Sequence, residues 1–117
     1  MRGVGIDLLE VRRLERAMER HPRLADRVFT PGELAYARAR GRPGRHLAAR
    51  FAAKEAAVKA LGLRHFGLRD IEVVVGEPPT LRLHGRAADA ARERGVELQV
   101  SLTHSQEMAA AVVVAGT

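Results

Sequence analysis

The stretch Phe51-Ala-Ala-Lys-Glu-Ala-Ala-Val-Lys-Ala60 decides the fold, because it forms the centre of the longest helical pattern in the chain. The pattern predicts a helix over residues 45–61 that ends at Gly62. At about 100° per residue, one stripe of this helix carries Leu47, Phe51, Lys54, Val58 and Leu61. Glu55 and Lys59 lie side by side along the edge of the stripe, between alanines that let a ligand or another backbone come close.

The same stretch holds both lysines of the chain, Lys54 and Lys59, whereas the other eighteen Lys or Arg positions are arginine. A lysine ammonium is a compact, movable charge that a planar guanidinium cannot replace. Glu55 lies between the two lysines, so one helix offers a carboxylate and two point charges. Such a set suits a divalent metal beside a phosphate, although chance survival of two lysines is an equally open explanation. Lys54, inside the apolar stripe, is expected either to extend its amine to solvent or to meet a buried anion.

Outward from this helix, the chain divides into early helices and late strands. A short strand over residues 4–6 stops at Asp7, and Asp7 and Glu10 have the spacing of a helix capping box. We expect three further helices: one that carries Val11, Leu14 and Met18, one that starts at Thr30, and one over residues 85–94. We expect four later strands, over residues 70–75, 80–84, 96–104 and 108–115. We therefore expect an α+β fold, with the long helix packed on a small antiparallel sheet and residues 1–117 forming a single domain.

The last expected strand is apolar at every position from Met108 to Ala115. A strand of this kind is covered on both faces. The long helix can cover one face, and too few residues remain in the chain to cover the other. The pattern therefore predicts that subunits pack together.

Composition narrows the class of protein. The chain has 117 residues, of which only 3% are aromatic. It has no cysteine, which excludes disulfides and thiolate metal sites. The sequence shows neither a secretory signal at its start nor an apolar run of about 18 residues, which predicts a soluble cytoplasmic protein without membrane contact. A net charge of +6 predicts an anionic partner, which could be a nucleic acid, an acidic protein or a phosphorylated small molecule.

Three residues are candidates for chemistry, and each has an ordinary structural explanation. Asp7 can cap a helix, Glu55 can pair with Lys59 one turn away, and His104 can be a polar residue at a strand end. Together, Asp7, Glu55 and Lys59 are the set that a hard divalent ion and a diphosphate require. Lys59 would then lie near the charge that develops on a leaving phosphate.

Several motifs occur in order along the chain. They are Val4-Gly-Ile-Asp-Leu-Leu-Glu10, Phe29-Thr-Pro-Gly-Glu33, Arg50-Phe-Ala-Ala-Lys-Glu-Ala-Ala-Val-Lys59, Asp70-Ile-Glu72 and Ser101-Leu-Thr-His-Ser105. This series resembles the holo-acyl-carrier-protein synthases, the small bacterial class of 4′-phosphopantetheinyl transferases, over essentially the full chain. The order and spacing of the motifs are specific, whereas any one of them alone is weak.

The resemblance implies an enzyme that uses Mg²⁺ to transfer phosphopantetheine from coenzyme A to a serine of apo-acyl carrier protein, for fatty acid biosynthesis. The other product would be adenosine 3′,5′-bisphosphate. Asp7 and Glu55 match the metal ligands, and Lys59 matches the phosphate-contacting lysine of that family. The residues expected to bind the coenzyme are Arg50, Lys54, Lys59, Gly62, His104 and Ser105. The resemblance also implies a homotrimer with active sites at subunit junctions.

The family pattern departs from this chain at two turns. The segment Leu61-Gly-Leu-Arg-His-Phe-Gly67 is shorter and bulkier than the glycine-rich loop that usually follows the lysine helix. The turn Gly76-Glu77-Pro78 holds a glutamate where the family commonly has a lysine. Coenzyme contacts from either turn therefore cannot be carried over.

A row of arginines follows one face of the first expected helix, at Arg13, Arg16 and Arg20. A row of this kind can steer an acidic carrier protein, although a solvated helix face is the ordinary alternative. A nucleic-acid-binding module is the main competing function, but the chain has few aromatic residues for base stacking and no basic, glycine-rich recognition loop. An inactive scaffold that still binds the carrier is a third possibility, and the intact Asp7, Glu55 and Lys59 argue against it.

Overall fold

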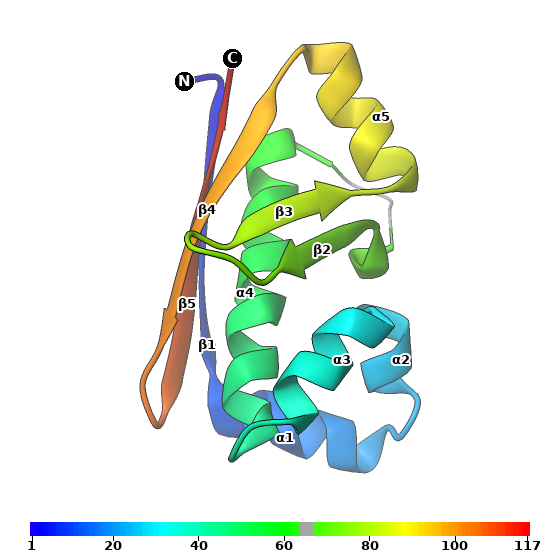
Figure 1. Ribbon diagram of the computed structural model, residues 1–117, viewed down its shortest axis with the longest axis vertical. Coiled ribbons are helices and arrows are strands. Elements are labelled where there is room, and N and C mark those ends of the chain that lie inside the picture. Colours follow the sequence, from blue (N-terminus) through cyan, green and yellow to red (C-terminus); the bar gives the residue numbers. More distant parts are fainter. Residues whose placement is uncertain (64–66) are drawn as a thin grey trace.

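The computed structural model describes residues 1–63 and 67–117. Its elements are β1 Gly3–Glu10, α1 Val11–Arg20, α2 Leu24–Val28, α3 Pro31–Arg38, α4 Pro43–Leu61, the 3₁₀ turn η1 Leu68–Asp70, β2 Ile71–Val74, β3 Thr80–Leu83, α5 Gly85–Arg94, β4 Glu97–His104 and β5 Met108–Gly116. The expected α+β class is confirmed, with the long helix on antiparallel sheet (Figure 1). None of the described helices is long and apolar enough to cross a membrane.

Two antiparallel sheets flank α4. The larger has the order β1-β5-β4, and the smaller pairs β2 with β3. Figure 1 shows the larger sheet as a layer along one side of α4, with α1, α2 and α3 gathered around the first turns of that helix and α5 at its far end. Because β5 is the central strand, β1 and β4 form opposite edges of the sheet.

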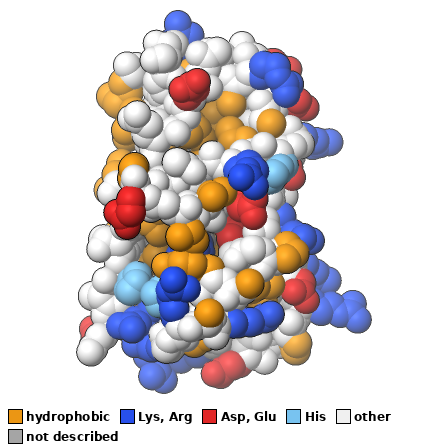
Figure 2. Space-filling model, in the orientation of Figure 1, with side chains coloured by type: hydrophobic (Ala, Val, Ile, Leu, Met, Phe, Trp, Pro, Cys, Tyr) orange, Lys and Arg blue, Asp and Glu red, His pale blue; other side chains and the backbone are white. Residues whose placement is uncertain are grey.

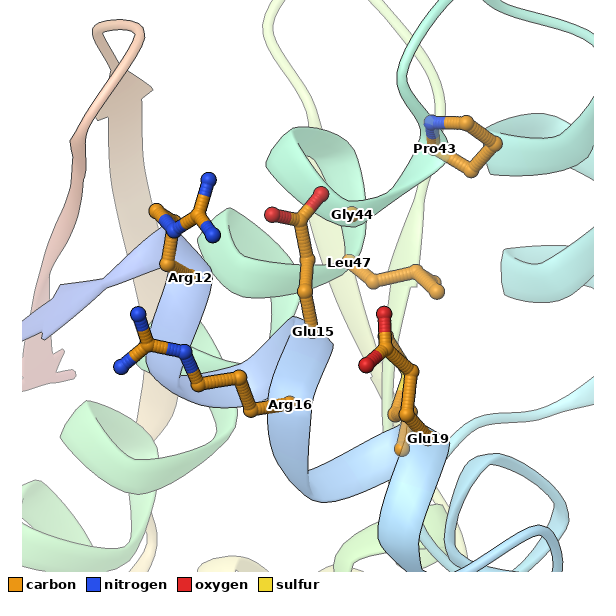
Figure 3. Close-up of a pocket in the computed structure, with 8 residues that line it drawn as sticks. Arg12, Glu15, Arg16, Glu19, Pro43, Gly44 and Leu47 are labelled. Atoms are coloured by element: carbon orange, nitrogen blue, oxygen red, sulfur yellow. The ribbon is translucent and has the colours of Figure 1, made fainter.

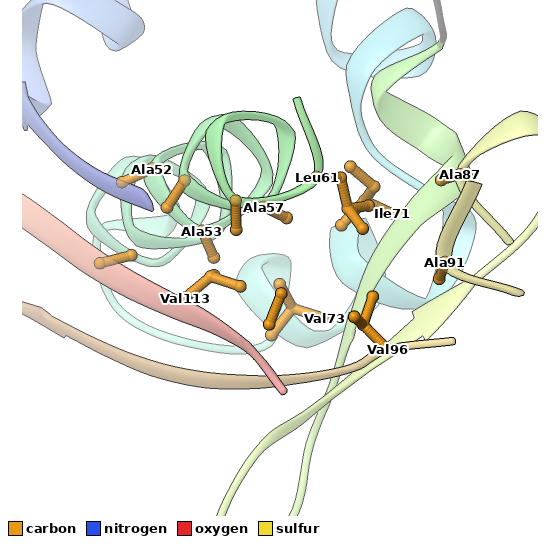
Figure 4. Close-up of a cluster of buried hydrophobic side chains, with 14 residues drawn as sticks. Ala52, Ala53, Ala57, Leu61, Ile71, Val73, Ala87, Ala91, Val96 and Val113 are labelled. Carbon is orange, nitrogen blue, oxygen red and sulfur yellow. The ribbon is translucent and has the colours of Figure 1, made fainter. Parts of the chain in front are cut away.

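Small residues let β1 and α4 approach very closely. A Cβ atom added to Gly3 would overlap the carbonyl oxygen of Ala60, and one added to Gly5 would overlap that of Ala56. The helix face on this side is built from alanines that are almost completely buried (Figure 4). The alanine face of α4 thus admits another backbone, that of the first strand, at Ala56 and Ala60.

The first strand is longer than its sequence indicates. It continues through Asp7 to Glu10, so the prediction of a capping box over residues 7–10 is wrong. The reason lies in long-range pairing: every residue from Gly3 to Glu10 has a partner on β5. This ladder holds the backbone extended past the point where the local apolar pattern ends. The helix α2 has no counterpart among the expected elements. The helix α4 begins at Pro43, two residues before the expected start at residue 45.

The capping box at the start of α3 is confirmed. Thr30 Oγ1 accepts a hydrogen bond from the Glu33 amide (3.2 Å), and the Glu33 carboxylate accepts one from the Thr30 amide (2.9 Å). Phe29 and Leu34 are buried in the same apolar cluster. This cap fixes Glu33 at 1% exposure, where its carboxylate can meet a second partner from α4.

The two faces of the larger sheet differ. Alternate residues of β5 are buried against α4, and the others are only partly covered. On the outer face, the side chains of Val4, Ile6 and Leu8 are 53%, 67% and 66% exposed. Their partners on β5 are also apolar: Val114, Val112 and Ala110. The helix therefore covers one face as expected, and the cover of the other face stays a prediction.

Candidate functional site

Asp7, Glu55 and Lys59 form what we call the carboxylate centre. Asp7 lies on the face of β1 that is turned toward α4, because alternate residues from Gly3 to Leu9 face inward. The Nζ atom of Lys59 donates to the carbonyl oxygen of Ile6 (2.8 Å) and lies 3.4 Å from Asp7 Oδ1. The strand and the helix thus bring together two of the residues that the sequence singled out, 52 positions apart.

The third member, Glu55, lies in the same electrostatic environment. Burial raises the pKa of the Glu55 carboxyl, the negative charge of Asp7 raises it further, and the positive charge of Lys59 lowers it. Two carboxylates that repel each other are a donor set that a hard divalent cation would neutralise. The residues present therefore fit Mg²⁺. The described residues offer no cluster of three or more His, Cys, Asp or Glu for a metal, so water or substrate oxygens would complete its coordination.

Lys54 has a different environment from Lys59, although both lie on α4. Its side chain is fully buried, its Nζ lies 2.7 Å from Glu33 Oε1, and it donates to the carbonyl oxygens of Leu68 (3.0 Å) and Ile71. All three hydrogens of the ammonium therefore have acceptors inside the protein. The structure confirms the expectation of a buried anion and contradicts Lys54 as a coenzyme contact, because the group is enclosed.

A second concentration of charge lies between α3, the first half of α4 and the end of β4. We call it the cationic cluster, and its members are Tyr36, Arg40, Arg45, His46, Arg50 and His104. The guanidinium carbons of Arg40 and Arg50 lie 3.5 and 4.0 Å from the centre of the Tyr36 ring. His46 meets Tyr36 edge-on at 5.8 Å and His104 edge-on at 5.0 Å, measured between ring centres.

Several buried nitrogen atoms in this cluster have no hydrogen-bond partner among the described residues. The Nε atoms of Arg45 and Arg50 and the Nδ1 atom of His104 are buried without a hydrogen-bond partner among the described residues. Burial lowers the pKa of Arg50. Burial also lowers the pKa of His46, and the positive charges of His104, Arg50, Arg45 and Arg40 lower it further. The cluster thus concentrates positive charge that the charge of Glu33, which acts on Arg50, offsets only in part, and this suits an anion.

The two sites lie on different sides of α4. Residues 50 and 55 of a helix are about 140° apart around its axis. The carboxylate centre adjoins β1, whereas His104 lies on β4, two strands and roughly 10 Å across the sheet. The structure therefore brings Asp7, Glu55 and Lys59 together, and Arg50 and His104 together, but it keeps the two groups apart within one chain.

Two other expected coenzyme contacts have structural roles. Gly62 ends α4 in a left-handed conformation (φ 68°), and its amide donates to the Lys59 carbonyl oxygen. Ser105 Oγ accepts hydrogen bonds from the amides of Glu107 (3.3 Å) and Met108 (3.1 Å), which closes the turn between β4 and β5. The expectation for residues 61–67 falls partly on positions 64–66, which lie outside the described residues.

The arginine row of α1 is exposed. Among the described residues, no ion pair involves Arg13, Arg16 or Arg20. Beside the row, a groove between α1 and the start of α4 is lined by both arginines and glutamates (Figure 3). Glu15 in this groove pairs with Arg42 at 3.2 Å. Figure 2 shows Lys and Arg side chains spread over the half of the molecule that holds α1, α2 and α3.

Sequence reasoning missed four members of the cationic cluster: Tyr36, Arg40, Arg45 and His46. A signal for one of them was present, because His46 precedes Arg50 by four residues and therefore lies one helical turn away. No local signal joins Tyr36 to these residues. That contact depends on how α3 packs against α4.

Comparisons with known proteins agree with this geometry. A model of the 4′-phosphopantetheinyl transferase superfamily matches residues 3–113. The chain is 56% identical to a holo-[acyl-carrier-protein] synthase of Moorella thermoacetica, over 96% of this chain and 91% of that protein. The structure is similar to that of the corresponding synthase from Neisseria meningitidis, with a TM-score of 0.88, 30% identity and coverage of 100% and 99% of the two chains. It is also similar to the Helicobacter pylori synthase in complex with coenzyme A, with a TM-score of 0.81, 26% identity and coverage of 97% and 99%.

The family match extends over nearly the whole chain, and the relative from Moorella is similar over nearly all of its own length. The resemblance seen in the ordered motifs is thereby confirmed. This chain belongs to the 4′-phosphopantetheinyl transferase superfamily.

Proposed function

We propose that this protein is a holo-acyl-carrier-protein synthase. It transfers 4′-phosphopantetheine from coenzyme A to a serine of apo-acyl carrier protein and releases adenosine 3′,5′-bisphosphate. The observation that carries this function is the carboxylate centre, where Asp7 and Glu55 lie beside Lys59 on the scaffold of this family. The synthases of similar sequence and the coenzyme A complex of similar structure support it. The product serves fatty acid biosynthesis.

The reaction needs positioning and charge neutralisation more than covalent chemistry by the protein. The serine oxygen bonds to the phosphorus next to pantetheine, and the bond from that phosphorus to the oxygen of the bisphosphate breaks. Asp7 and Glu55 would hold Mg²⁺, which would supply positive charge against the diphosphate. Lys59 offsets the negative charge of the departing bisphosphate. Glu55 accepts the serine proton, directly or through water.

We further propose that the active sites lie at subunit junctions of a homotrimer. The exposed apolar face of Val4, Ile6 and Leu8 supports such an assembly, because a large apolar patch marks an interaction site. The separation of the carboxylate centre from the cationic cluster supports it as well. Within one chain the cationic cluster does not reach the carboxylate centre. In an assembly, the cluster of one subunit can lie beside the carboxylate centre of its neighbour. Each chain contributes one domain, residues 1–117, to a cytoplasmic enzyme without membrane or nucleic-acid partners.

The acidic carrier protein docks on the arginine row of α1 in this proposal. The three arginines are exposed and lack ion-pair partners among the described residues, so their charge is available for steering. Arg13→Glu should weaken binding of the carrier and slow its association, with coenzyme A affinity nearly unchanged. Surface plasmon resonance with apo-carrier, beside calorimetry with coenzyme A, measures both. Equal loss of the two affinities would place the docking surface elsewhere.

The direct test is to incubate the protein with apo-carrier, coenzyme A and Mg²⁺ and to weigh the carrier by mass spectrometry. The carrier should gain one phosphopantetheine group, and chelation of the metal should prevent the gain. Glu55→Gln should abolish transfer while leaving the fold intact, whereas the matched variant Glu93→Gln on α5 should leave it unchanged. An unmodified carrier in the presence of wild-type protein and metal would refute the function, and would favour a scaffold that only binds the carrier.

A further inference from the structure

Arg94, the last residue of α5, links the ends of three elements. Its guanidinium donates to the carbonyl oxygen of Ala60 (3.0 Å) and to that of Arg2 (2.8 Å). Arg2 returns a hydrogen bond to the carbonyl oxygen of Arg94 (3.1 Å). Within residues 1–63 and 67–117, no ion pair involves either arginine. One side chain therefore joins the start of β1, the end of α4 and the end of α5, which lie at the same end of the molecule (Figure 1).

The bond to Ala60 closes the last turn of α4. Carbonyl oxygens in this turn have no partner within the helix, and the amide of Gly62 bonds to the oxygen of Lys59. Arg94 gives the Ala60 oxygen its donor and places a positive charge at the negative end of the helix dipole. The same oxygen also faces β1, where a Cβ atom added to Gly3 would overlap it. It therefore contacts both the strand backbone and the guanidinium.

The close crossing of β1 over α4 has a cation at each end. Lys59 donates to the carbonyl oxygen of Ile6 (2.8 Å), and Arg94 donates to that of Arg2. The glycines that let the strand approach the helix lie between these two acceptors. A glycine has no side chain that could interlock with the helix. The two side-chain hydrogen bonds therefore supply what the glycines lack, which is a pair of fixed points along the strand.

Each acid of the carboxylate centre lies on an element that Arg94 holds. Asp7 is on β1 and Glu55 is on α4, so a shift of the strand along the helix would change the separation of the two carboxylates. The first residues of a chain fray unless the fold ties them down. The side chain of Lys59 is 54% exposed and faces the proposed substrate. Arg94 is therefore the tie that a bound substrate leaves unchanged.

Taking the proposed function as given, we infer that Arg94 is a positioning residue, which fixes β1 along α4 and thereby sets the separation of Asp7 and Glu55 for Mg²⁺. Arg94 acts through the main-chain oxygens of both elements and contributes no metal ligand of its own. Its planar fork suits this task, because two of its N–H groups reach two carbonyl oxygens at once.

Two substitutions separate the fork from the charge. Arg94→Gln removes the charge and cannot reach both carbonyl oxygens, whereas Arg94→Lys keeps the charge but offers a single point donor. Arg92→Gln is the matched control, because Arg92 lies on the same helix, is exposed and pairs with Asp89 (3.0 Å). It removes one positive charge from α5 and leaves the bonds to Ala60 and Arg2 in place.

The experiment measures two properties of the full chain, without carrier or coenzyme A, at a temperature where every variant is folded by circular dichroism. Hydrogen exchange reports the opening of β1, and electron paramagnetic resonance of free Mn²⁺ gives the affinity of the carboxylate centre for a divalent ion. In Arg94→Gln, the amides of residues 3–7 should exchange about tenfold faster and Mn²⁺ should bind about three- to tenfold more weakly, as expected for the loss of one or two hydrogen bonds. Arg94→Lys should lie between Arg94→Gln and wild type, and Arg92→Gln should match wild type.

The transfer assay adds a third measurement. Arg94→Gln should raise the Mg²⁺ concentration that gives half the maximal rate, while the KM for apo-carrier stays unchanged, because the arginine row of α1 is not altered. Unchanged Mn²⁺ affinity in Arg94→Gln, whatever its melting temperature, would reduce Arg94 to a helix cap and overturn the positioning role. Absence of transfer by the wild type would instead refute the proposed function, and the exchange and Mn²⁺ measurements do not depend on transfer.

Discussion

Lys54 and Lys59 are the only two lysines of the chain, and they lie five residues apart on the same helix. Their environments are opposite. The side chain of Lys54 is completely buried and enclosed by Glu33 and two carbonyl oxygens, whereas that of Lys59 is 54% exposed beside Asp7. About 140° of rotation around the helix separates the two positions. That rotation turns Lys54 toward α3, η1 and β2, and turns Lys59 toward the edge formed by β1.

One residue type can therefore serve stability at one position and chemistry at another. Burial lowers the pKa of Lys54, and the negative charge and hydrogen bond of Glu33 oppose that change. Its charge is committed to partners within the fold and joins three elements to α4. Lys59 lies on the protein surface beside Asp7 and the carbonyl oxygen of Ile6, and its charge also acts on Glu55, so it is available to a substrate bound at these carboxylates.

The largest effect should come from removing the buried charge. Lys54→Met leaves the Glu33 carboxylate enclosed without its cation, which should lower the free energy of unfolding by about 3–5 kcal/mol. Urea denaturation followed by circular dichroism measures this loss. The double variant Lys54→Met with Glu33→Gln should recover part of the stability, because no unpaired charge then remains. A loss below about 1 kcal/mol for the single variant would contradict the enclosed ion pair.

Replacing the exposed lysine should have a smaller effect, and on the activation free energy of transfer instead of on the free energy of unfolding. Lys59→Gln should lower the rate of transfer by about a hundredfold, as expected when one group that stabilises a leaving charge is removed. Because the lysine is solvated, the free energy of unfolding should change by no more than about 0.5 kcal/mol. Steady-state kinetics and denaturation of the same preparation give both numbers. Comparable losses of stability in Lys59→Gln and Lys54→Met would remove the contrast between the two positions.

The smallest effect should appear in the pH dependence of stability near Lys59. The pKa of Glu55 is raised in the folded protein. The free energy of unfolding therefore falls as pH rises from the ordinary glutamate pKa to the raised one, and it stays lower above that range. In the absence of metal, Glu55→Gln should therefore be slightly more stable than wild type at pH 7. The advantage should disappear below the ordinary glutamate range, where both forms are neutral. Thermal melts from pH 3 to 8 measure this difference, and a less stable variant at pH 7 would show that the carboxylate is favourably placed.

Much of the fold could be predicted from local patterns. The long helix, the cap at Thr30, the late strands and the separate pair β2 and β3 were all visible as periodicity or capping chemistry. The end of β1 could not be predicted, because pairing with β5 extends the strand beyond its local apolar pattern. The turn of α2 was missed because its five residues are too few to show a clear period.

The carboxylate centre could be predicted as a set of residue types, and the ordered motifs placed it in the right family. Its assembly could not be read locally, since Asp7 and Lys59 are 52 positions apart and meet only because glycines let β1 approach α4. Lys54 is expected among the coenzyme contacts only through the resemblance, whereas its place in the apolar stripe predicts either an amine in solvent or a buried anion. Its real partner, Glu33, lies on another helix.

Local sequence patterns are enough to identify the groups that this protein possesses: a lysine-bearing alanine helix, two separated acids, a net positive charge and an apolar last strand. These follow from composition and from periods of two or 3.6 residues, which are local properties of the chain. Which charges are enclosed and which face solvent depends on how the elements pack in three dimensions. Burial and distance between remote residues set the energy of a charge, and neither exists until the helix, the strands and the sheet edges have packed together.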